Sequence, residues 1–209
     1  MKLLNIKLLV IAFVLLITGS AFASLSYDVT VDTSSLNGQG GYLYLQYDPL
    51  NGLASTATVS NFATNGTLGA QDTVDVVNGS AVKGTLLSGS VVFANTNGVN
   101  DYNHAITFGN SLSFLLSFNS TPGAPAGGVS TFSLGLFGDA LGSTPLMNTN
   151  GGNTAPGTVI DVNLQNDGTT SVDQYVQQAT ATPTPIPAAA YLFGSGLLGL
   201  VGIRRKAKN

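Results

Sequence analysis

The middle of this chain alternates apolar and polar residues with a period of two. The clearest example is the stretch LSYDVTVD at residues 25–32, in which every odd-numbered residue is apolar. Successive side chains of a β-strand point to opposite faces, so this pattern predicts a strand with one buried face and one solvated face. Residues 111–118 and 131–137 repeat the alternation. The period therefore favours strands over helices for the body of the protein.

The composition of the body supports this prediction. Gly, Asn, Ser and Thr are frequent, Glu is absent, and helix formers other than Ala and Leu are scarce. Residues 42–47 (YLYLQY) are apolar on nearly both faces, which indicates a central strand. Short apolar segments separated by turn residues predict further strands at 56–62, 73–77, 83–87, 90–94, 101–108, 158–164 and 171–176. About ten short strands at this spacing predict an all-β fold, an antiparallel β-sandwich of the jelly-roll-like kind.

The N-terminus has the three parts of a secretory signal peptide. Lys2 and Lys7 make the first residues a short positive region, and residues 8–17 are apolar. Ala21 and Ala23 form an A-x-A cleavage site. We expect residues 1–23 to form a signal helix that signal peptidase removes, so that the mature chain starts at Ser24. Residues 24–176 would then form the β-sandwich domain.

The C-terminus predicts a membrane anchor. Residues 177–187 are rich in Thr, Pro and Ala and predict an extended, disordered linker. Residues 188–203 carry no charge and would span roughly 24 Å as a helix, short but usable for a hydrocarbon core about 30 Å thick. Residues 204–209 form a basic end, which indicates the cytoplasmic side. A permanent anchor and a helix buried in a soluble core are the alternatives, and the adjacent cations disfavour the second.

This tail resembles the PEP-CTERM sorting signal of Gram-negative bacteria. The resemblance rests on Pro185-Ile186-Pro187, the run AAAYLFGSGLLGLVGI, and the basic stop Arg204-Arg205-Lys206. Ile186 stands where the family's namesake signal has glutamate, as in a variant of that signal. In the family, exosortase, a membrane-embedded protease with a cysteine nucleophile, recognises the tail. The resemblance implies an inner-membrane-anchored precursor whose body passes to the cell surface or the extracellular matrix.

The body is also similar to a small uncharacterised family of PEP-CTERM proteins. The similar segments are VDTSSLNGQGGYLYLQYDPLNGLASTATVSNF, ITFGNSLSFLLSF and VIDVNLQNDGTTSV. This resemblance implies a shared β-sandwich and carries no catalytic residues with it.

The charge of the body excludes some partners. Between residues 24 and 187 the ten aspartates and the single cation, Lys83, give a formal charge of −9. An acidic body without basic patches argues against nucleic acids and anionic membrane surfaces as partners. The chain has no cysteine, which removes thiol catalysis and cysteine-ligated metals.

No arrangement of residues predicts an enzyme. His104 is the sole histidine, and we expect it on the surface at the start of a strand rather than acting as a catalytic base. Asp72 and Asp75 would lie on opposite faces of a strand, which does not suit a pair of glycosidase carboxylates.

Calcium is the one cofactor for which the sequence offers ligands. Asn95, Asn97 and Asp101 bring hard oxygen donors to one loop, and Asn166-Asp167 with Asp161 offers a second set. Ordinary turn chemistry is the favoured explanation of the same residues.

Tyr42 and Tyr44 share one face of a predicted strand and could form a platform for sugar rings, or could be half-buried structural residues. The leading interpretation is an exported, non-enzymatic protein with a structural or adhesive role in exopolysaccharide or biofilm. A carbohydrate-binding module, with or without calcium, is the first alternative. A secreted hydrolase is the second.

Overall fold

The computed structural model describes residues 25–72, 82–95, 100–120, 127–150 and 155–184, and these residues form two antiparallel six-stranded sheets. Sheet A has the order β12-β1-β8-β3-β6-β5, with bounds Ala179–Thr184, Leu25–Asp32, Ser111–Ser120, Ser55–Thr64, Ser90–Ala94 and Val82–Thr85. Sheet B has the order β11-β10-β9-β2-β7-β4, with bounds Thr170–Gln174, Thr158–Gln165, Val129–Phe137, Gly40–Asp48, Asp101–Thr107 and Thr67–Gln71. The prediction of an antiparallel all-β fold is confirmed.

The apolar faces of the two sheets pack against each other. Phe93 of β6 in sheet A lies against Tyr102 of β7 and Phe132 of β9 in sheet B, with ring centroids 6.4 and 6.0 Å apart. Phe114 of β8 contacts Phe132 from the same side at 6.1 Å. These edge-to-face contacts belong to one core that draws on strands of both sheets. The fold is therefore sandwich-like.

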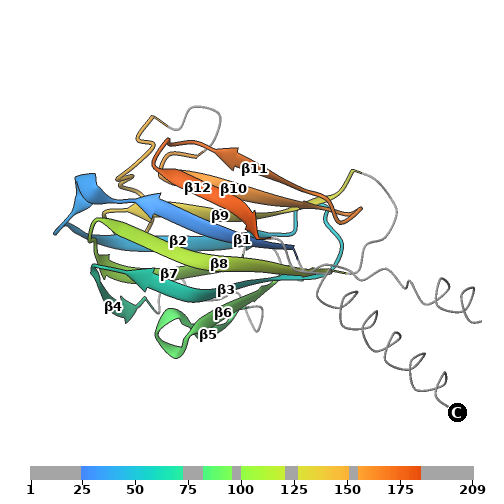
Figure 1. Ribbon diagram of the computed structural model, residues 1–209, viewed down its shortest axis with the longest axis horizontal. Coiled ribbons are helices and arrows are strands. Elements are labelled where there is room, and N and C mark those ends of the chain that lie inside the picture. The colour runs from blue at the N-terminus through green and yellow to red at the C-terminus, as the bar shows by residue number, and fades with distance from the viewer. Residues whose placement is uncertain (1–24, 73–81, 96–99, 121–126, 151–154, 185–209) are drawn as a thin grey trace, which may run out of the picture. The chain divides into compact units, whose positions relative to one another are not determined.

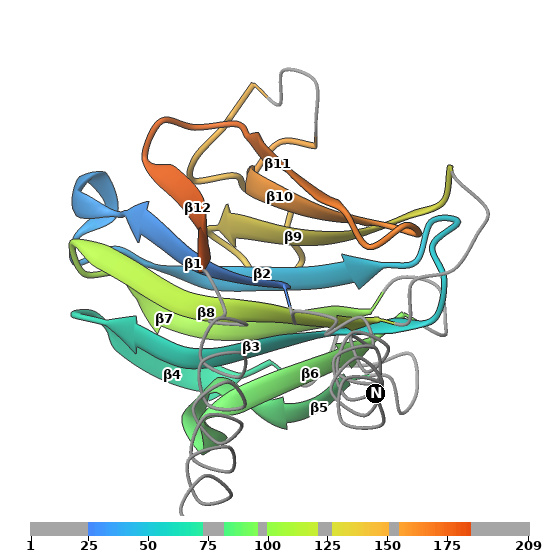
Figure 2. The same cartoon turned by 45° about the vertical axis from the view of Figure 1, so that its right-hand side comes forward.

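Most successive strands lie in different sheets; among the described strands, only β5 and β6, β9 and β10, and β10 and β11 pair directly with their neighbour in sequence. The chain runs from β1 in sheet A to β2 in sheet B, then to β3 in sheet A and β4 in sheet B. Most neighbours within a sheet are consequently far apart in sequence: β1 pairs with β8, and β2 lies between β7 and β9 (Figures 1 and 2). The central position predicted for residues 42–47 is confirmed.

One predicted strand is shorter in the structure, and one strand of the structure was not predicted. Residues 67–71 form β4, which was not expected, whereas the strand expected at 73–77 lies outside the described residues. The strand expected at 83–87 ends at Thr85, because the side chain of Thr85 accepts the backbone N–H of Ser88 and starts a 3₁₀ turn at Leu86–Ser88. Gly89, at φ 100°, ends that turn in a left-handed conformation.

Most of the linker expected at residues 177–187 is a β-strand in the structure. Residues 179–184 are not a disordered connection but the edge strand β12, paired with β1 from Val31↔Ala179 to Ser26↔Thr184. Ala179 is fully buried, which fixes the start of the strand against the core. Pro183 is tolerated because an edge strand leaves one row of backbone groups without a ladder partner.

The two terminal segments lie outside the described residues. They comprise the expected signal helix (1–23), the transmembrane helix (188–203) and the basic tail (204–209). The described part of the chain contains no helix with the length and apolar character of a membrane span.

Candidate functional site

The outer face of sheet B carries a row of polar side chains across five strands. In register, Asp101 of β7 lies opposite Gln46 of β2, Gln46 opposite Ser133 of β9, Ser133 opposite Asp161 of β10, and Asp161 opposite Asp173 of β11. Asp48, the last residue of β2, lies two residues after Gln46 and on the same face. Neighbouring strands lie about 4.8 Å apart, so the register alone brings these carboxylates onto one surface. We call this surface, defined by Asp48, Asp101, Asp161 and Asp173, the acidic face.

The carboxylates of the acidic face influence one another. Partial burial and, to a smaller extent, the negative charges of Asp101 and Asp161 together raise the pKa of Asp48 to about 6. Burial also raises the pKa of Asp161, and the charge of Asp173 adds to that shift, although hydrogen bonds from Ser133 and Tyr175 oppose it. The hydroxyl of Tyr175 donates to Asp161 Oδ2 at 2.9 Å. Oδ1 of Asp48 and Oδ1 of Asp161 are enclosed without a hydrogen-bond donor.

The tyrosines predicted as a glycan platform lie on this same face. Tyr42 and Tyr44 alternate with buried Leu43 and Leu45 on β2, and both are half-buried. Tyr44 packs edge-on against Phe137 at 5.2 Å, and its hydroxyl donates to the carbonyl of Ala140 at 3.2 Å. Tyr44 therefore helps to hold the segment after β9 in place.

Of the residues predicted as calcium ligands, Asn95 is engaged in hydrogen bonds within the fold. Asn95 is 5% exposed, and its Oδ1 accepts the backbone N–H of Ser55 at 2.7 Å. Its Nδ2 donates to the carbonyl of Leu53 at 2.7 Å and to Ser130 Oγ at 2.8 Å. Asp101 belongs to the acidic face, and Asn97 lies outside the described residues. Asn95 thus has the hydrogen bonds of a structural residue.

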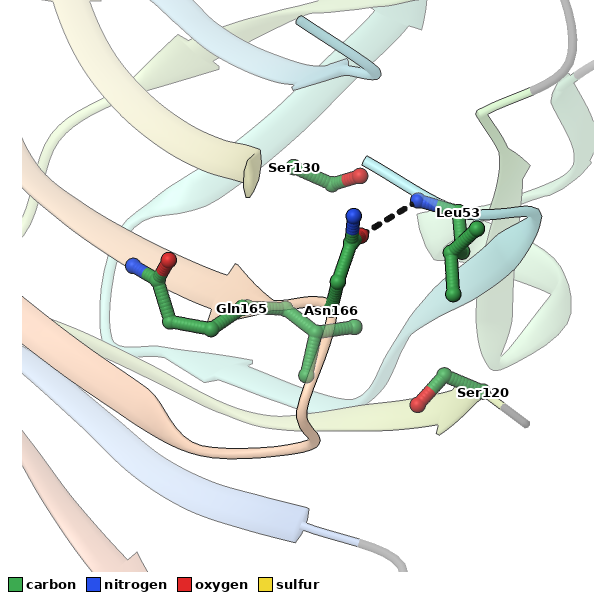
Figure 3. A pocket seen from close by; sticks show the side chains of 6 residues that line it. Leu53, Ser120, Ser130, Gln165 and Asn166 are labelled. Carbon is green, nitrogen blue, oxygen red and sulfur yellow. Dashed lines mark hydrogen bonds between the residues drawn. The ribbon is translucent and has the colours of Figure 1, made fainter. Parts of the chain in front are cut away.

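The second predicted set of oxygen donors is also structural. Asn166 Oδ1 accepts the backbone N–H of Leu53 at 2.7 Å, and Figure 3 shows this amide turned toward Leu53 beside Ser130. The cavity next to it measures about 10 Å³, room for about one water. Asp167 accepts the backbone N–H of Thr169 at 2.8 Å within the β10–β11 turn. Among the described residues, no three acidic or histidine side chains are placed to hold a metal ion.

His104 is not the surface residue that the sequence predicts. It is 0% exposed, faces the core from β7, and its ring lies 5.9 Å from that of Tyr102. Its Nδ1 lies 3.0 Å from the carbonyl oxygen of Ala105, and its Nε2 has no hydrogen-bond partner. A buried ring of this kind cannot reach a substrate, so histidine-based hydrolysis is not supported. Asp72 follows β4, and Asp75 lies outside the described residues.

Sequence reasoning missed Asp48, Asp161 and Asp173 as members of one surface. The alternation of β2 does place Asp48 on the face of Tyr42 and Tyr44, and that signal was available. The proximity of Asp48 to Asp101 and Asp161 follows from strand pairing, which the local pattern does not contain. Comparisons with known protein families, with characterised proteins and with solved structures find no match to this chain.

Proposed function

We propose that this chain is an exported, non-enzymatic β-sandwich protein with a structural or adhesive role at a bacterial cell surface or in an exopolysaccharide matrix. Residues 1–23 direct secretion, and the tail that begins at Pro185-Ile186-Pro187 directs sorting by an exosortase-type protease of a Gram-negative bacterium. The two sheets form a jelly-roll-like sandwich, in keeping with the strand order β1-β8-β3-β6 facing β2-β7-β4.

The position of the folded unit along the chain supports this proposal most directly. The compact unit runs from Leu25 to Thr184. It begins one residue after the expected new N-terminus at Ser24 and ends one residue before Pro185. Removal of both terminal segments would therefore leave every described strand in place.

Mass spectrometry of the protein before and after export tests the sorting role. We expect the exported form to begin at Ser24 and to lack residues 188–209, and we expect a Pro185→Ala/Pro187→Ala variant to accumulate as the longer precursor. Full-length tail on the exported wild-type protein would contradict the proposal and would support a permanent anchor.

Carbohydrate binding by the outer face of sheet B is the second candidate. It is favoured by one observation, the presence of Tyr42 and Tyr44 on the same face as the half-buried carboxylates of Asp48 and Asp161. Aromatic rings can stack on sugar rings, and carboxylates accept hydrogen bonds from sugar hydroxyls.

Affinity electrophoresis in gels that contain polysaccharide tests this second candidate. We expect Tyr42→Ala and Tyr44→Ala to reduce the retardation, while Leu87→Ala, which removes an exposed apolar side chain from the turn after β5 of sheet A, serves as the control. Retardation that is equal in all four proteins would exclude this face as the binding surface.

A further inference from the structure

The opposite surface of the domain, the outer face of sheet A, contains an open groove of about 490 Å³. Its volume lies in the range of sites that take small ligands. The side chains that line it come from four neighbouring strands and are Asp28, Thr30, Asn61, Ser113, Leu115 and Thr184. We call it the sheet A groove.

Strand register explains why these side chains converge. Asp28 lies opposite Leu115, and Thr30 lies opposite Ser113, where β1 pairs with β8. On the other side of β8, the ladder with β3 shifts between Ser60 and Ala63, so that β3 bulges at this point. Asn61 occupies the bulge with φ 53°, a left-handed conformation that asparagine tolerates better than most residues. The bulge thereby brings Asn61, with its side-chain amide, into the lining of the groove.

The charge of the groove selects among ligands. Asp28 is the one charged residue that lines it among the described residues, and its carboxylate has no hydrogen bond or ion pair with them. Lys83 lies on β5, four strands away from β1, roughly 19 Å at ordinary strand spacing and beyond the screening length of physiological salt. Anionic ligands are therefore disfavoured, and a ligand with a positive charge is complementary.

The remaining lining favours a sugar over a peptide. β1 and β8, which form the centre of the groove, are each paired on both sides, so their backbone groups are already engaged and cannot take up an added peptide strand there. Thr30, Ser113 and Asn61 offer hydroxyl and amide groups, which both donate and accept hydrogen bonds. Leu115 provides an apolar position among them, suited to the C–H face of a sugar ring.

We propose that the sheet A groove binds an amino-sugar oligosaccharide. The protonated amine pairs with Asp28, the ring hydroxyls bond to Thr30, Ser113 and Asn61, and one ring packs on Leu115. The inference rests on the proposed function in one respect, since export is what brings this groove to an extracellular polysaccharide.

Calorimetric titration of the full chain in detergent micelles with deacetylated chito-oligosaccharide tests the proposal, at a pH at which the amine is protonated. N-acetylated chito-oligosaccharide, with the same backbone and no charge, is the matched probe. We expect the deacetylated form to bind and the acetylated form to bind more weakly. Asp28→Asn should weaken binding roughly three- to fivefold. Asp32→Asn removes the same charge from the same face of β1 outside the groove, and should leave binding unchanged.

Two further variants test the groove itself. Ser113→Tyr should fill it and reduce affinity about tenfold or more, whereas Thr58→Tyr, on the same outer face but outside the groove, should not. Asn61→Gly keeps the left-handed backbone and removes the amide, so its weaker binding is interpretable even if Ser113→Tyr folds poorly. Absence of binding, equal affinity for both sugars, or loss of binding in the control variants would overturn the proposal.

Oligolysine provides the last comparison. If oligolysine binds with the same sensitivity to Asp28→Asn and Asn61→Gly, the groove is a basic-peptide site and the sugar proposal is wrong. None of these results alters the masses measured for export, so failure here is distinguishable from failure of the proposed function.

Discussion

Asn95 illustrates how a polar side chain can join the two layers of the fold. It follows β6 of sheet A, and its amide bonds to the backbone of Leu53 and Ser55 and to Ser130 of β9 in sheet B. Both ends of the amide are used, as burial requires. In the sequence, the same residue in a polar loop is equally a candidate calcium ligand, because composition alone does not separate a ligand from a buried structural residue.

We expect Asn95→Ala to lower the free energy of unfolding by about 2–4 kcal/mol, because three hydrogen bonds are lost and buried partners remain unsatisfied. Urea denaturation, with Asn163→Ala on the outer face as control, measures the difference. Millimolar calcium should not change the stability of the wild-type protein or of the variant. A calcium-dependent rise in stability that the variant lacks would restore the metal interpretation.

Asp48 destabilises the folded state when it is ionised. Its pKa is raised from 3.8 in the unfolded chain to about 6. The folded state therefore binds the proton of Asp48 more tightly than the unfolded chain does. The protonated carboxyl makes its full contribution to the free energy of unfolding below pH 4, and this contribution is lost as the pH rises through about 6. The carboxyl is about half exposed, so solvent screening reduces the effect to about 1 kcal/mol.

Asp48→Asn should consequently raise the unfolding free energy at pH 7 by about 1 kcal/mol and should have little effect below pH 4. Thermal or urea unfolding across pH 3.5–7.5 measures the profile. Asp32→Asn is the control, since hydrogen bonds from Ser34 lower the pKa of Asp32, and its replacement should not stabilise the protein. A stabilisation that is independent of pH would contradict the argument.

At the scale of elements, β12 determines where the folded domain ends. It extends sheet A beyond β1, and its first residue, Ala179, is buried. Just before it, the backbone N–H of Asp32 donates to the carbonyl of Gln178 at 2.9 Å. The Ala- and Thr-rich sequence with a proline reads as a linker because it lacks large apolar residues. Pairing with β1 supplies the order that its composition does not predict.

Shortening the chain separates the two interpretations of residues 179–184. A chain that ends after Thr184 should unfold like the untruncated body, whereas one that ends after Gln178 should lose about 2–4 kcal/mol, because the ladder to β1 and the burial of Ala179 are removed. Urea unfolding of both chains measures this difference. Equal stability of the two chains would show that residues 179–184 behave as a linker and do not stabilise the domain.

At the scale of the whole molecule, the two sheets depend on one core. Phe93 contacts aromatic rings of β7 and β9 across the interface, so its loss affects both layers. Most ladders join strands that are distant in sequence, such as β1 with β8, so folding must close long loops before these contacts form. We expect neither sheet to persist without the other.

Phe93→Ala should lower the unfolding free energy by about 3–5 kcal/mol. The chain has no tryptophan, so the buried tyrosines Tyr47 and Tyr102 of sheet B provide the fluorescence signal. Their transition should coincide with the loss of strand signal in far-ultraviolet circular dichroism, as in a two-state transition. Two separated transitions would show that the sheets unfold independently.

The strand character of the body, and the face of the strand on which each side chain lies, follow from the local sequence. Tyr27, Val29 and Val31 are buried, and Asp28 and Thr30 are exposed, as the alternation predicts. The double-sided apolar pattern of β2 likewise indicated its central position. These features are local, because a strand turns successive side chains to opposite faces whatever its partners are.

Tertiary structure alone decided which strands became neighbours. Residues 48, 101 and 161 share the acidic face, and residues 28, 61 and 113 share the sheet A groove, because β-strand pairing brings together segments that no local pattern connects. The burial of His104 and the ordering of β12 have the same origin. Pairing is selected by how the whole set of apolar faces packs into one core, and that selection is a property of the complete chain.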